Sequence, residues 1–146
     1  MICRLANYSR DALSILEGAQ DFISRTPFIH LMPDNEQDLL NVLGRILTLE
    51  NVEVMVVEHK RKVVAGLGFL FTPYHWNPKV LVADELFWWA SKDAPFGAAY
   101  KLIYWSLNRV KDKGAIPIFH MLSTSPKGVD RIYRRLGLNP SETAYV

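Results

Sequence analysis

The segment from residue 79 to residue 114 constrains the fold of this chain more than any other part of its sequence. It predicts an apolar strand at residues 79–90, a short loop at residues 91–97 and then a long helix. The first turn of a helix leaves backbone N–H groups without intrahelical partners, and the helix dipole places partial positive charge there. Because this helix begins with small side chains, a phosphate or pyrophosphate could approach its amides closely.

Length and composition favour one globular domain over residues 1–146. A chain of 146 residues can bury one core and is too short for two ordinary domains. Its 49% hydrophobic and 22% charged residues are typical of a folded, soluble protein. The apolar runs are shorter than a membrane span and no secretory signal is visible, so we expect a cytoplasmic protein that does not contact membranes. The single cysteine, Cys3, agrees with a reducing compartment.

The net charge and the few cysteines and histidines argue against nucleic acid and metal ions as partners. The formal net charge is only +2 and the basic residues are scattered, so nucleic acid is not an expected partner. One cysteine and four separated histidines do not form a metal-ligand pattern, so no metal is expected.

Two amphipathic helices are predicted in the first third of the chain, after a short strand at residues 2–7. Ser9 is a candidate N-cap for the first helix, and Pro27 ends it because the residue before a proline avoids the helical region. Asp34 with Gln37 resembles a capping box at the start of the second helix, whose leucines and isoleucines recur at helical spacing.

The rest of the chain is predicted to consist mainly of strands. The expected elements are strands at residues 52–58 and 63–71, a loop at residues 72–78, the strand and helix described above, a strand at residues 115–122, a helix that Ser125 caps and Gly137 ends, and a strand at residues 143–146. The whole order, β-α-α-β-β-β-α-β-α-β, requires a mixed, mostly antiparallel sheet with helices on both faces. The predicted class is therefore α/β.

Four segments in this order carry a resemblance to a known family. They are Ile2-Cys-Arg-Leu-Ala-Asn7 with Asp11-Ala12, Val63-Val-Ala-Gly-Leu-Gly-Phe69, the strand–loop–helix at residues 79–114, and Ile132-Tyr-Arg-Arg-Leu-Gly-Leu138 followed by a closing segment. Over almost the whole chain this pattern resembles the GNAT superfamily of acetyl-coenzyme A-dependent N-acyltransferases. The resemblance implies one GNAT-like domain that takes acetyl-coenzyme A as its co-substrate.

The coenzyme loop of that family follows the pattern Arg/Gln-x-x-Gly-x-Gly/Ala and binds pyrophosphate through backbone amides. It aligns here with residues 94–99, where Gly97 and Ala99 match and Ala94 replaces the Arg or Gln. Pro95 removes one N–H donor from the loop. The resemblance implies that the coenzyme is bound by Ala94, Phe96, Gly97, Ala98 and Ala99. Without the resemblance, the same residues describe an ordinary helix start.

Acyl transfer to an amine needs a base for the amine proton and an acid for the departing thiolate. The resemblance places Tyr133 at the position of the acid, and the pKa of a phenol lies near that of a thiol. Glu85 interrupts an apolar strand and is the candidate base, acting directly or through a water, because burial raises the pKa of a carboxyl group. Asp84 points to the opposite face of the strand. The plainer interpretations are a core position for Tyr133 and a solvent-facing one for Glu85.

Histidines and tryptophans supply the remaining candidates. His120 ends the predicted fifth strand, near where such a sheet opens for the thioester, and His30 and His75 lie in loops that would rim an acceptor site. A lone histidine on a strand is more often structural. Trp88 and Trp89 should point to opposite faces of their strand. A structural role in the core is one interpretation of the two indoles. The alternative is that one of them contacts the acyl or pantetheine arm of the coenzyme.

Two functions follow from these observations. The first is an N-acetyltransferase that moves an acetyl group from acetyl-coenzyme A to a primary amine of an unknown acceptor, either a small molecule or a protein. The second is a catalytically degenerate protein of the same fold that has lost coenzyme binding and acts as a binding or inhibitory partner, and that could be encoded by a phage. The residues Ala94 and Pro95 and the aromatic segment at residues 71–76 motivate it. An exposed edge strand or that aromatic segment could also support a homodimer.

Overall fold

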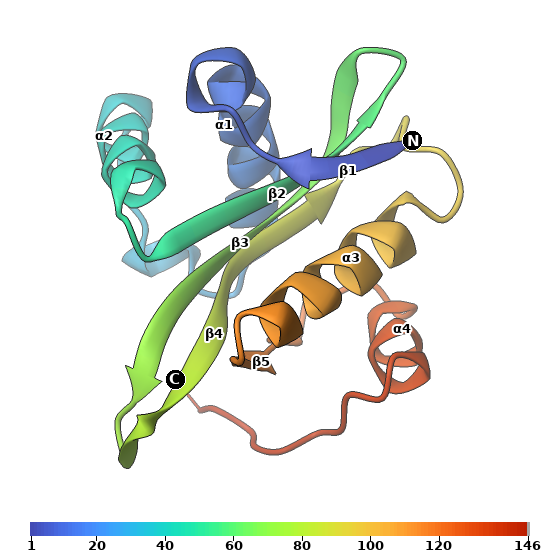
Figure 1. The fold of residues 1–146 in the computed structure, drawn as a ribbon. Coiled ribbons are helices and arrows are strands. Elements are labelled where there is room, and N and C mark those ends of the chain that lie inside the picture. The colour runs from blue at the N-terminus through green and yellow to red at the C-terminus, as the bar shows by residue number, and fades with distance from the viewer. Residues whose placement is uncertain (146) are drawn as a thin grey trace.

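An antiparallel meander in the middle of the chain forms the centre of the sheet (Figure 1). The computed structural model describes residues 1–145, and its sheet has the order β1-β2-β3-β4-β5. β1 (Ile2–Leu5), β2 (Val52–His59), β3 (Lys62–Tyr74) and β4 (Asn77–Ala90) pair antiparallel, and β5 (Ile116–Ile118) pairs parallel with β4. The predicted mixed, mostly antiparallel sheet is confirmed.

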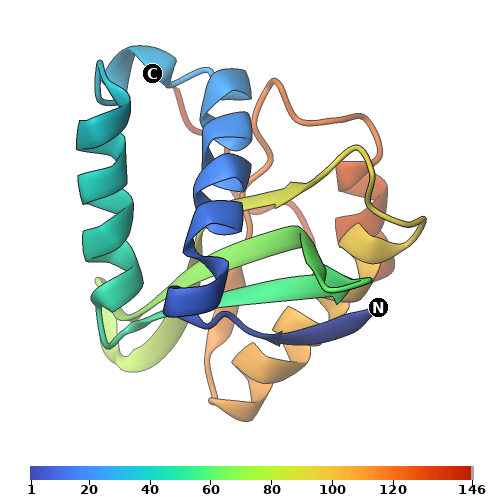
Figure 2. The ribbon, with the colours of Figure 1, turned by 90° about the horizontal axis from the view of Figure 1, so that it is seen from above.

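Helices cover both faces of this sheet, as the element order predicts. α1 (Tyr8–Arg25) and α2 (Glu36–Thr48), joined through the 3-10 helix η1 (Ile29–Leu31), lie on one face. α3 (Ala98–Asp112) and α4 (Val129–Arg135) lie on the other face (Figures 1 and 2). The α/β class is therefore confirmed, and the sheet is buried between two helical layers.

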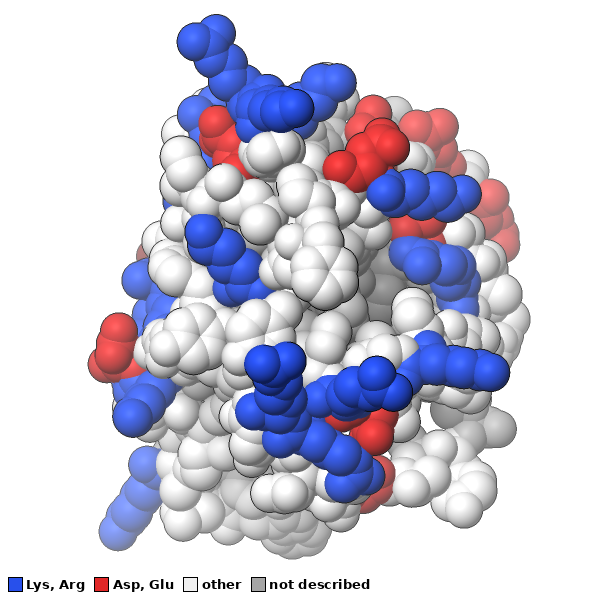
Figure 3. All heavy atoms as spheres, turned by 90° about the vertical axis from the view of Figure 1, so that its right-hand side faces the viewer, with Lys and Arg blue, Asp and Glu red and all other residues white. Residues whose placement is uncertain are grey.

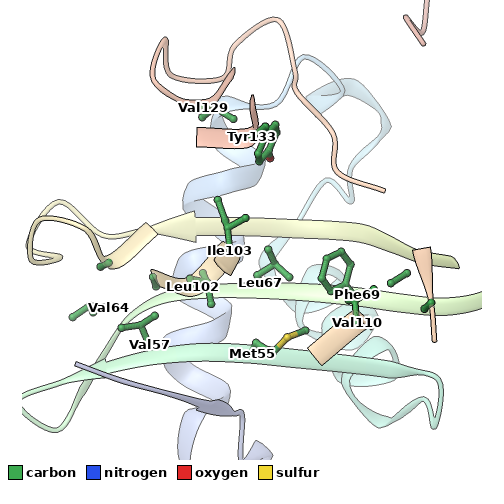
Figure 4. Packing of buried hydrophobic residues seen from close by; sticks show 14 of the residues in the cluster. Met55, Val57, Val64, Leu67, Phe69, Leu102, Ile103, Val110, Val129 and Tyr133 are labelled. Atoms are coloured by element: carbon green, nitrogen blue, oxygen red, sulfur yellow. The ribbon is translucent and has the colours of Figure 1, made fainter. Parts of the chain in front are cut away.

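The larger part of the core lies between the sheet and α3. Figure 4 shows Leu67 and Phe69 of β3 facing Leu102 and Ile103 of α3, with Tyr133 of α4 beyond them. Leu67, Phe69, Leu102 and Ile103 are fully buried. Burial of such side chains contributes about 1.5–3 kcal/mol each, so this packing fixes α3 against the sheet.

A second cluster lies between the sheet and α1, and Trp89 is its largest member. Trp89 belongs to this cluster, whereas Trp88 packs against the cluster on the α3 side, which confirms that the two indoles point to opposite faces. Gly18 of α1 and Gly66 of β3 make room for Trp89, because a Cβ atom on either glycine would overlap the indole ring. These two glycines allow α1 to approach the sheet closely.

The capping residues of the first two helices differ from those predicted, by two residues in α1 and by one in α2. Asn7, and not Ser9, caps α1 through its side-chain oxygen, which accepts the N–H of Arg10. Asn35, and not Asp34, caps α2 in the same way. Asparagine competes well with serine and aspartate for such positions, so neighbouring cap residues are hard to rank from sequence.

The strand predicted at residues 115–122 is wrong in length, because β5 contains only Ile116–Ile118. Beyond it, the N–H of His120 donates to a side-chain oxygen of Glu85 and not to the backbone of β4. Ser125 does not cap α4: its hydroxyl accepts the N–H of Leu122, and α4 begins only at Val129. The predicted last strand is also wrong at residues 143–145, which form no regular structure, and residue 146 lies outside the described residues.

Two smaller boundaries change as well. The loop predicted at residues 72–78 belongs mostly to the sheet, because Tyr74 of β3 pairs with Asn77 of β4. Only His75 and Trp76 remain in the turn between them. The first strand ends at Leu5 and not at residue 7, because Asn7 already caps α1.

Candidate active site

A cavity opens where β5 separates from β4. The two strands pair only from Val82 to Asp84 of β4, and beyond this point the chain after β5 turns away from the sheet. The cavity has a volume of about 270 Å³ and lies between the end of β4, the start of α3, α4 and the segment that precedes α4. It is lined by Phe22, Arg25, Trp88, Trp89, Ala90, Ala99, Leu122, Thr124, Ser125, Pro126, Gly128, Val129 and Ile132.

The turn at the start of α3 lies next to this cavity. The Ala98 N–H donates to the Pro95 carbonyl, and Gly97 has a φ of 85° and a ψ of −3°, which is the third position of a type II turn. Ala99 lines the cavity. Among residues 1–145, no hydrogen-bond partner is found for the backbone N–H groups of Phe96, Gly97 and Ala99. Three of the predicted amides are therefore free for an anion, and the amide of Ala98 is not.

The other two residues of the predicted coenzyme loop have different surroundings. Ala94 packs against the core on the α3 side, and its N–H donates to the Ser91 carbonyl. The Phe96 side chain is fully exposed. The side chains of Ala94 and Phe96 thus place no polar group beside the turn.

Basic side chains surround this end of the molecule. Figure 3 shows them gathered on the side where α4 and the start of α3 lie. Arg131, Arg134 and Arg135 of α4 are exposed, and the Arg135 guanidinium lies 5.5 Å from the ring centre of Tyr100 in the first turn of α3. Arg25 of α1 lines the cavity itself. Arg25 and Arg134 each pair with an aspartate one turn earlier, Asp21 and Asp130, so only part of this positive charge is available to attract a negatively charged ligand.

Glu85 is a buried carboxylate at the point where the sheet opens. A β-bulge between Glu85 and Phe87 interrupts the pairing of β4 with β3. One Glu85 oxygen, Oε2, accepts the His120 N–H at 3.0 Å and lies 3.4 Å from the Tyr133 hydroxyl. Burial raises the pKa of Glu85 from 4.5 to about 7, although the His120 N–H opposes that shift. The solvent-facing interpretation of Glu85 is wrong.

The Tyr133 hydroxyl lies at the centre of a small hydrogen-bond network. It accepts the Trp88 indole N–H at 3.0 Å, and it can donate to Glu85 Oε2 at 3.4 Å or to the His120 carbonyl at 3.3 Å. A phenol has one proton, so it donates to only one of these acceptors at a time. Burial, and then the negative charge of Glu85, raise the pKa of Tyr133 well above its usual range. Tyr133 therefore combines a core position with a polar contact to Glu85.

Asp84 and His120 form a separate pair beside this network. The His120 Nε2 and an Asp84 carboxylate oxygen lie 2.8 Å apart, and both side chains are close to half exposed. His120 therefore contacts Asp84 through its ring, Glu85 through its N–H and Tyr133 through its carbonyl. The sequence indicated His120 as a candidate but gave no signal for its pairing with Asp84, which depends on the separation of β5 from β4.

None of the three predicted acceptor residues, His30, His75 and His120, lines the cavity. His30 lies in η1 and is exposed. His75 lies in the β3–β4 turn, between the rings of Tyr74 and Trp76. The structure does not bring His30 and His75 together with Glu85 and Tyr133, so their acceptor role stays a prediction.

Some residues of the site were not predicted from sequence. Phe22 and Arg25 line the cavity from the last turns of α1. In sequence they belong to an ordinary amphipathic helix that stops before Pro27, and only the packing of α1 beside the end of β4 brings them to the cavity.

The described residues, 1–145, contain neither a candidate metal site nor a helix that could span a membrane. This part of the chain contains no group of three or more His, Cys, Asp or Glu side chains that could hold a metal ion. None of its helices is long and apolar enough to span a membrane.

The fold is similar to those of several solved proteins. No protein-family model and no curated protein matches the sequence. Among solved structures, a transcriptional regulator from Bacillus halodurans is 20% identical with a TM-score of 0.76, over 99% of this chain and 97% of that one. A ribosomal-protein-alanine N-acetyltransferase from Brucella melitensis is 14% identical with a TM-score of 0.72, over 100% and 96% of the two chains.

A GNAT family acetyltransferase from Staphylococcus aureus is 16% identical with a TM-score of 0.66, over 99% of this chain and 96% of that one. These similarities extend over the full length of each pair. The chain therefore has the GNAT fold that the sequence pattern predicts, and the strand–loop–helix of residues 79–114 corresponds to β4, the following loop and α3.

Proposed function

We propose that this chain is a GNAT-type N-acetyltransferase that transfers an acetyl group from acetyl-coenzyme A to a primary amine. The observation that carries the proposal is one continuous arrangement. Ala99, one of the residues with a free amide, and Trp88 both line the cavity, and the Trp88 indole N–H contacts the hydroxyl of Tyr133, which lies behind this wall. The Tyr133 hydroxyl in turn contacts the buried carboxylate of Glu85.

The residues present fit the parts of acetyl-coenzyme A. The free N–H groups of Phe96, Gly97 and Ala99 would hold the pyrophosphate, with the helix dipole adding to the attraction. Arg135 stands beside the first turn of α3, where it would supply positive charge that Ala94 lacks. Trp88 and Ile132, which both line the cavity, would contact the pantetheine arm in a largely apolar passage.

Glu85 and Tyr133 would carry the proton transfers, and acetyl-coenzyme A supplies the activated acyl group when it is bound. A pKa of about 7 suits Glu85 to remove a proton from an amine near neutral pH. The Tyr133 hydroxyl would donate a proton to the departing thiolate.

The proposed activity is tested by following thiol release from acetyl-coenzyme A with a panel of primary amines that includes polyamines, aminoglycosides and peptides with free N-termini. We expect amine-dependent thiol release that Tyr133→Phe slows by about 10²-fold or more, the usual contribution of a general acid, while coenzyme affinity is retained. Amine-dependent release at equal rates in wild type and Tyr133→Phe would remove Tyr133 from the mechanism. Absence of coenzyme binding would remove the whole proposal.

A second candidate function is a binding or inhibitory protein that has lost the coenzyme. The observation in its favour is the turn at the start of α3, where Pro95 has no N–H and the Ala98 N–H is already occupied. The fully exposed Phe96 and the exposed Trp76 would then serve as contact residues for a partner. A protein of this kind would not bind acetyl-coenzyme A and would purify with a stable partner.

A further inference from the structure

Three side chains from two elements form a continuous hydrogen-bonded chain behind the cavity. The Trp88 indole N–H of β4 donates to the Tyr133 hydroxyl of α4, and this hydroxyl lies 3.4 Å from Oε2 of Glu85, again on β4. All three side chains are buried or half-buried. The Trp88 N–H occupies an acceptor position on the phenol oxygen and leaves its proton to point toward Glu85 or the His120 carbonyl.

We propose that Glu85 and Tyr133 act together as a proton relay. Glu85 takes a proton from the amine and passes it to the Tyr133 oxygen, while Tyr133 gives its own proton to the departing thiolate. The relay rests on the proposed acetyl transfer for its chemistry. The hydrogen-bonded chain itself is a property of the free protein and can be tested without a substrate.

The relay balances without any further reactant. The amine nitrogen forms a bond to the acetyl carbon and gives one proton to a Glu85 oxygen. The carbon–sulfur bond breaks, and its electron pair leaves on sulfur. The Tyr133 proton moves to this sulfur, and the proton held by Glu85 moves to the Tyr133 oxygen. The products are an amide and a free thiol, and both side chains regain their starting protonation states.

Such a relay explains how Tyr133 can protonate a thiolate although its pKa lies above that of a thiol. Burial raises the pKa of Tyr133 far above that of a thiol, which is about 8.5 for free cysteine, so a phenol acting alone would give up its proton unfavourably. Protonated Glu85, with a pKa of about 7, is a stronger acid than a thiol. With Glu85 as the source and Tyr133 as the carrier, transfer to sulfur becomes favourable.

The charged and titratable groups around Glu85 are few. Asp84 precedes it on β4 and opposes its ionisation, His120 beyond β5 favours it, and Tyr133 faces it from α4. On β3, the residue paired with Glu85 is the apolar Phe69. The His120 imidazole is also the ring partner of Asp84, so the experiment includes a His120 variant to isolate the contribution of Glu85.

The chain is tested by proton–nitrogen NMR of the indole N–H groups of the free protein as a function of pH. We expect the Trp88 resonance to shift with a midpoint near pH 7, because ionisation of Glu85 alters the hydrogen bond that Tyr133 makes. The shift should disappear in Glu85→Gln and in Tyr133→Phe, and it should persist in His120→Asn, which keeps the backbone groups of residue 120. The indole of Trp105 on α3 is the internal control and should show no such midpoint.

Each outcome decides the proposal. A Trp88 resonance that is independent of pH near neutrality, or one that still titrates in Tyr133→Phe, would overturn the relay even if the enzyme is active. If Glu85→Gln does not fold, the Tyr133→Phe spectrum still decides the question. A titrating chain in a protein that fails to bind acetyl-coenzyme A would overturn the proposed function and leave the hydrogen-bonded chain standing.

Discussion

The indole nitrogen of Trp88 lies 3.0 Å from the hydroxyl oxygen of Tyr133, although the two residues are 45 positions apart in the chain. This hydrogen bond joins β4 to α4 across the wall of the cavity. Because α4 contains only seven residues, it depends on such tertiary contacts for its position. Trp88 is therefore a positioning residue for Tyr133.

Trp88→Phe should keep the fold and disturb Tyr133. The variant removes one hydrogen bond to a buried hydroxyl, which costs about 1–3 kcal/mol of unfolding free energy in urea titrations. In the acetyl-transfer assay it should lower kcat more than it raises KM, because the Tyr133 proton is needed in the transition state. An equal loss in Trp105→Phe on α3 would show that the effect is not specific to this hydrogen bond.

Gly18→Ala should destabilise the protein although alanine is the better helix former. A Cβ atom at Gly18 would overlap the Trp89 indole, and overpacking of this kind costs typically 1–3 kcal/mol. The matched control is Gly44→Ala in α2, where the added Cβ would meet nothing nearer than the Tyr8 hydroxyl at 3.8 Å. That control should be neutral or stabilising by up to about 1 kcal/mol. Equal effects of the two variants on the urea midpoint would contradict this account of α1 packing.

Glu85 should make the protein less stable as the pH rises. Its pKa is raised from 4.5 in the unfolded chain to about 7 in the folded one, so the folded state binds the proton more tightly. The resulting stabilisation is complete below pH 4.5 and is lost as the pH rises through about 7. Above that pH the difference amounts to on the order of 3 kcal/mol.

Glu85→Gln removes this dependence and is the direct check. The variant should be more stable than wild type at pH 8, and its advantage should shrink as the pH falls toward 5. Urea unfolding at several pH values measures both chains. Parallel stability curves for the two proteins would mean that Glu85 does not titrate near neutrality in the folded state.

Most of the fold could be predicted from the sequence because its signals are local. Periodicity located the helices, and β-branched runs located the central strands of the sheet. The errors fall where tertiary contacts override local preference. β5 is shorter than its apolar run because the His120 amide bonds the Glu85 side chain, and the chain end at residues 143–145 has no strand beside it.

The candidate site was predictable only in part. The small residues at the start of α3, the isolated carboxylate Glu85 and the position of Tyr133 are visible in the sequence. The hydrogen bonds that connect Trp88, Tyr133 and Glu85 depend on where α4 packs, and no spacing along the chain encodes that position. The presence of Arg25 in the cavity likewise depends on how α1 lies against β4.

The most direct test of the central claim is a calorimetric titration of acetyl-coenzyme A into wild type, Gly97→Asp and Gly114→Asp. Gly97 and Gly114 both have positive φ values and open space around them, but they stand at opposite ends of α3. The two variants therefore introduce the same strain and charge, and only Gly97→Asp places the charge on the free amides. We predict saturable binding to wild type and to Gly114→Asp and none to Gly97→Asp. Absence of binding to wild type, or equal binding to both variants, would contradict the assignment of this turn as the coenzyme site.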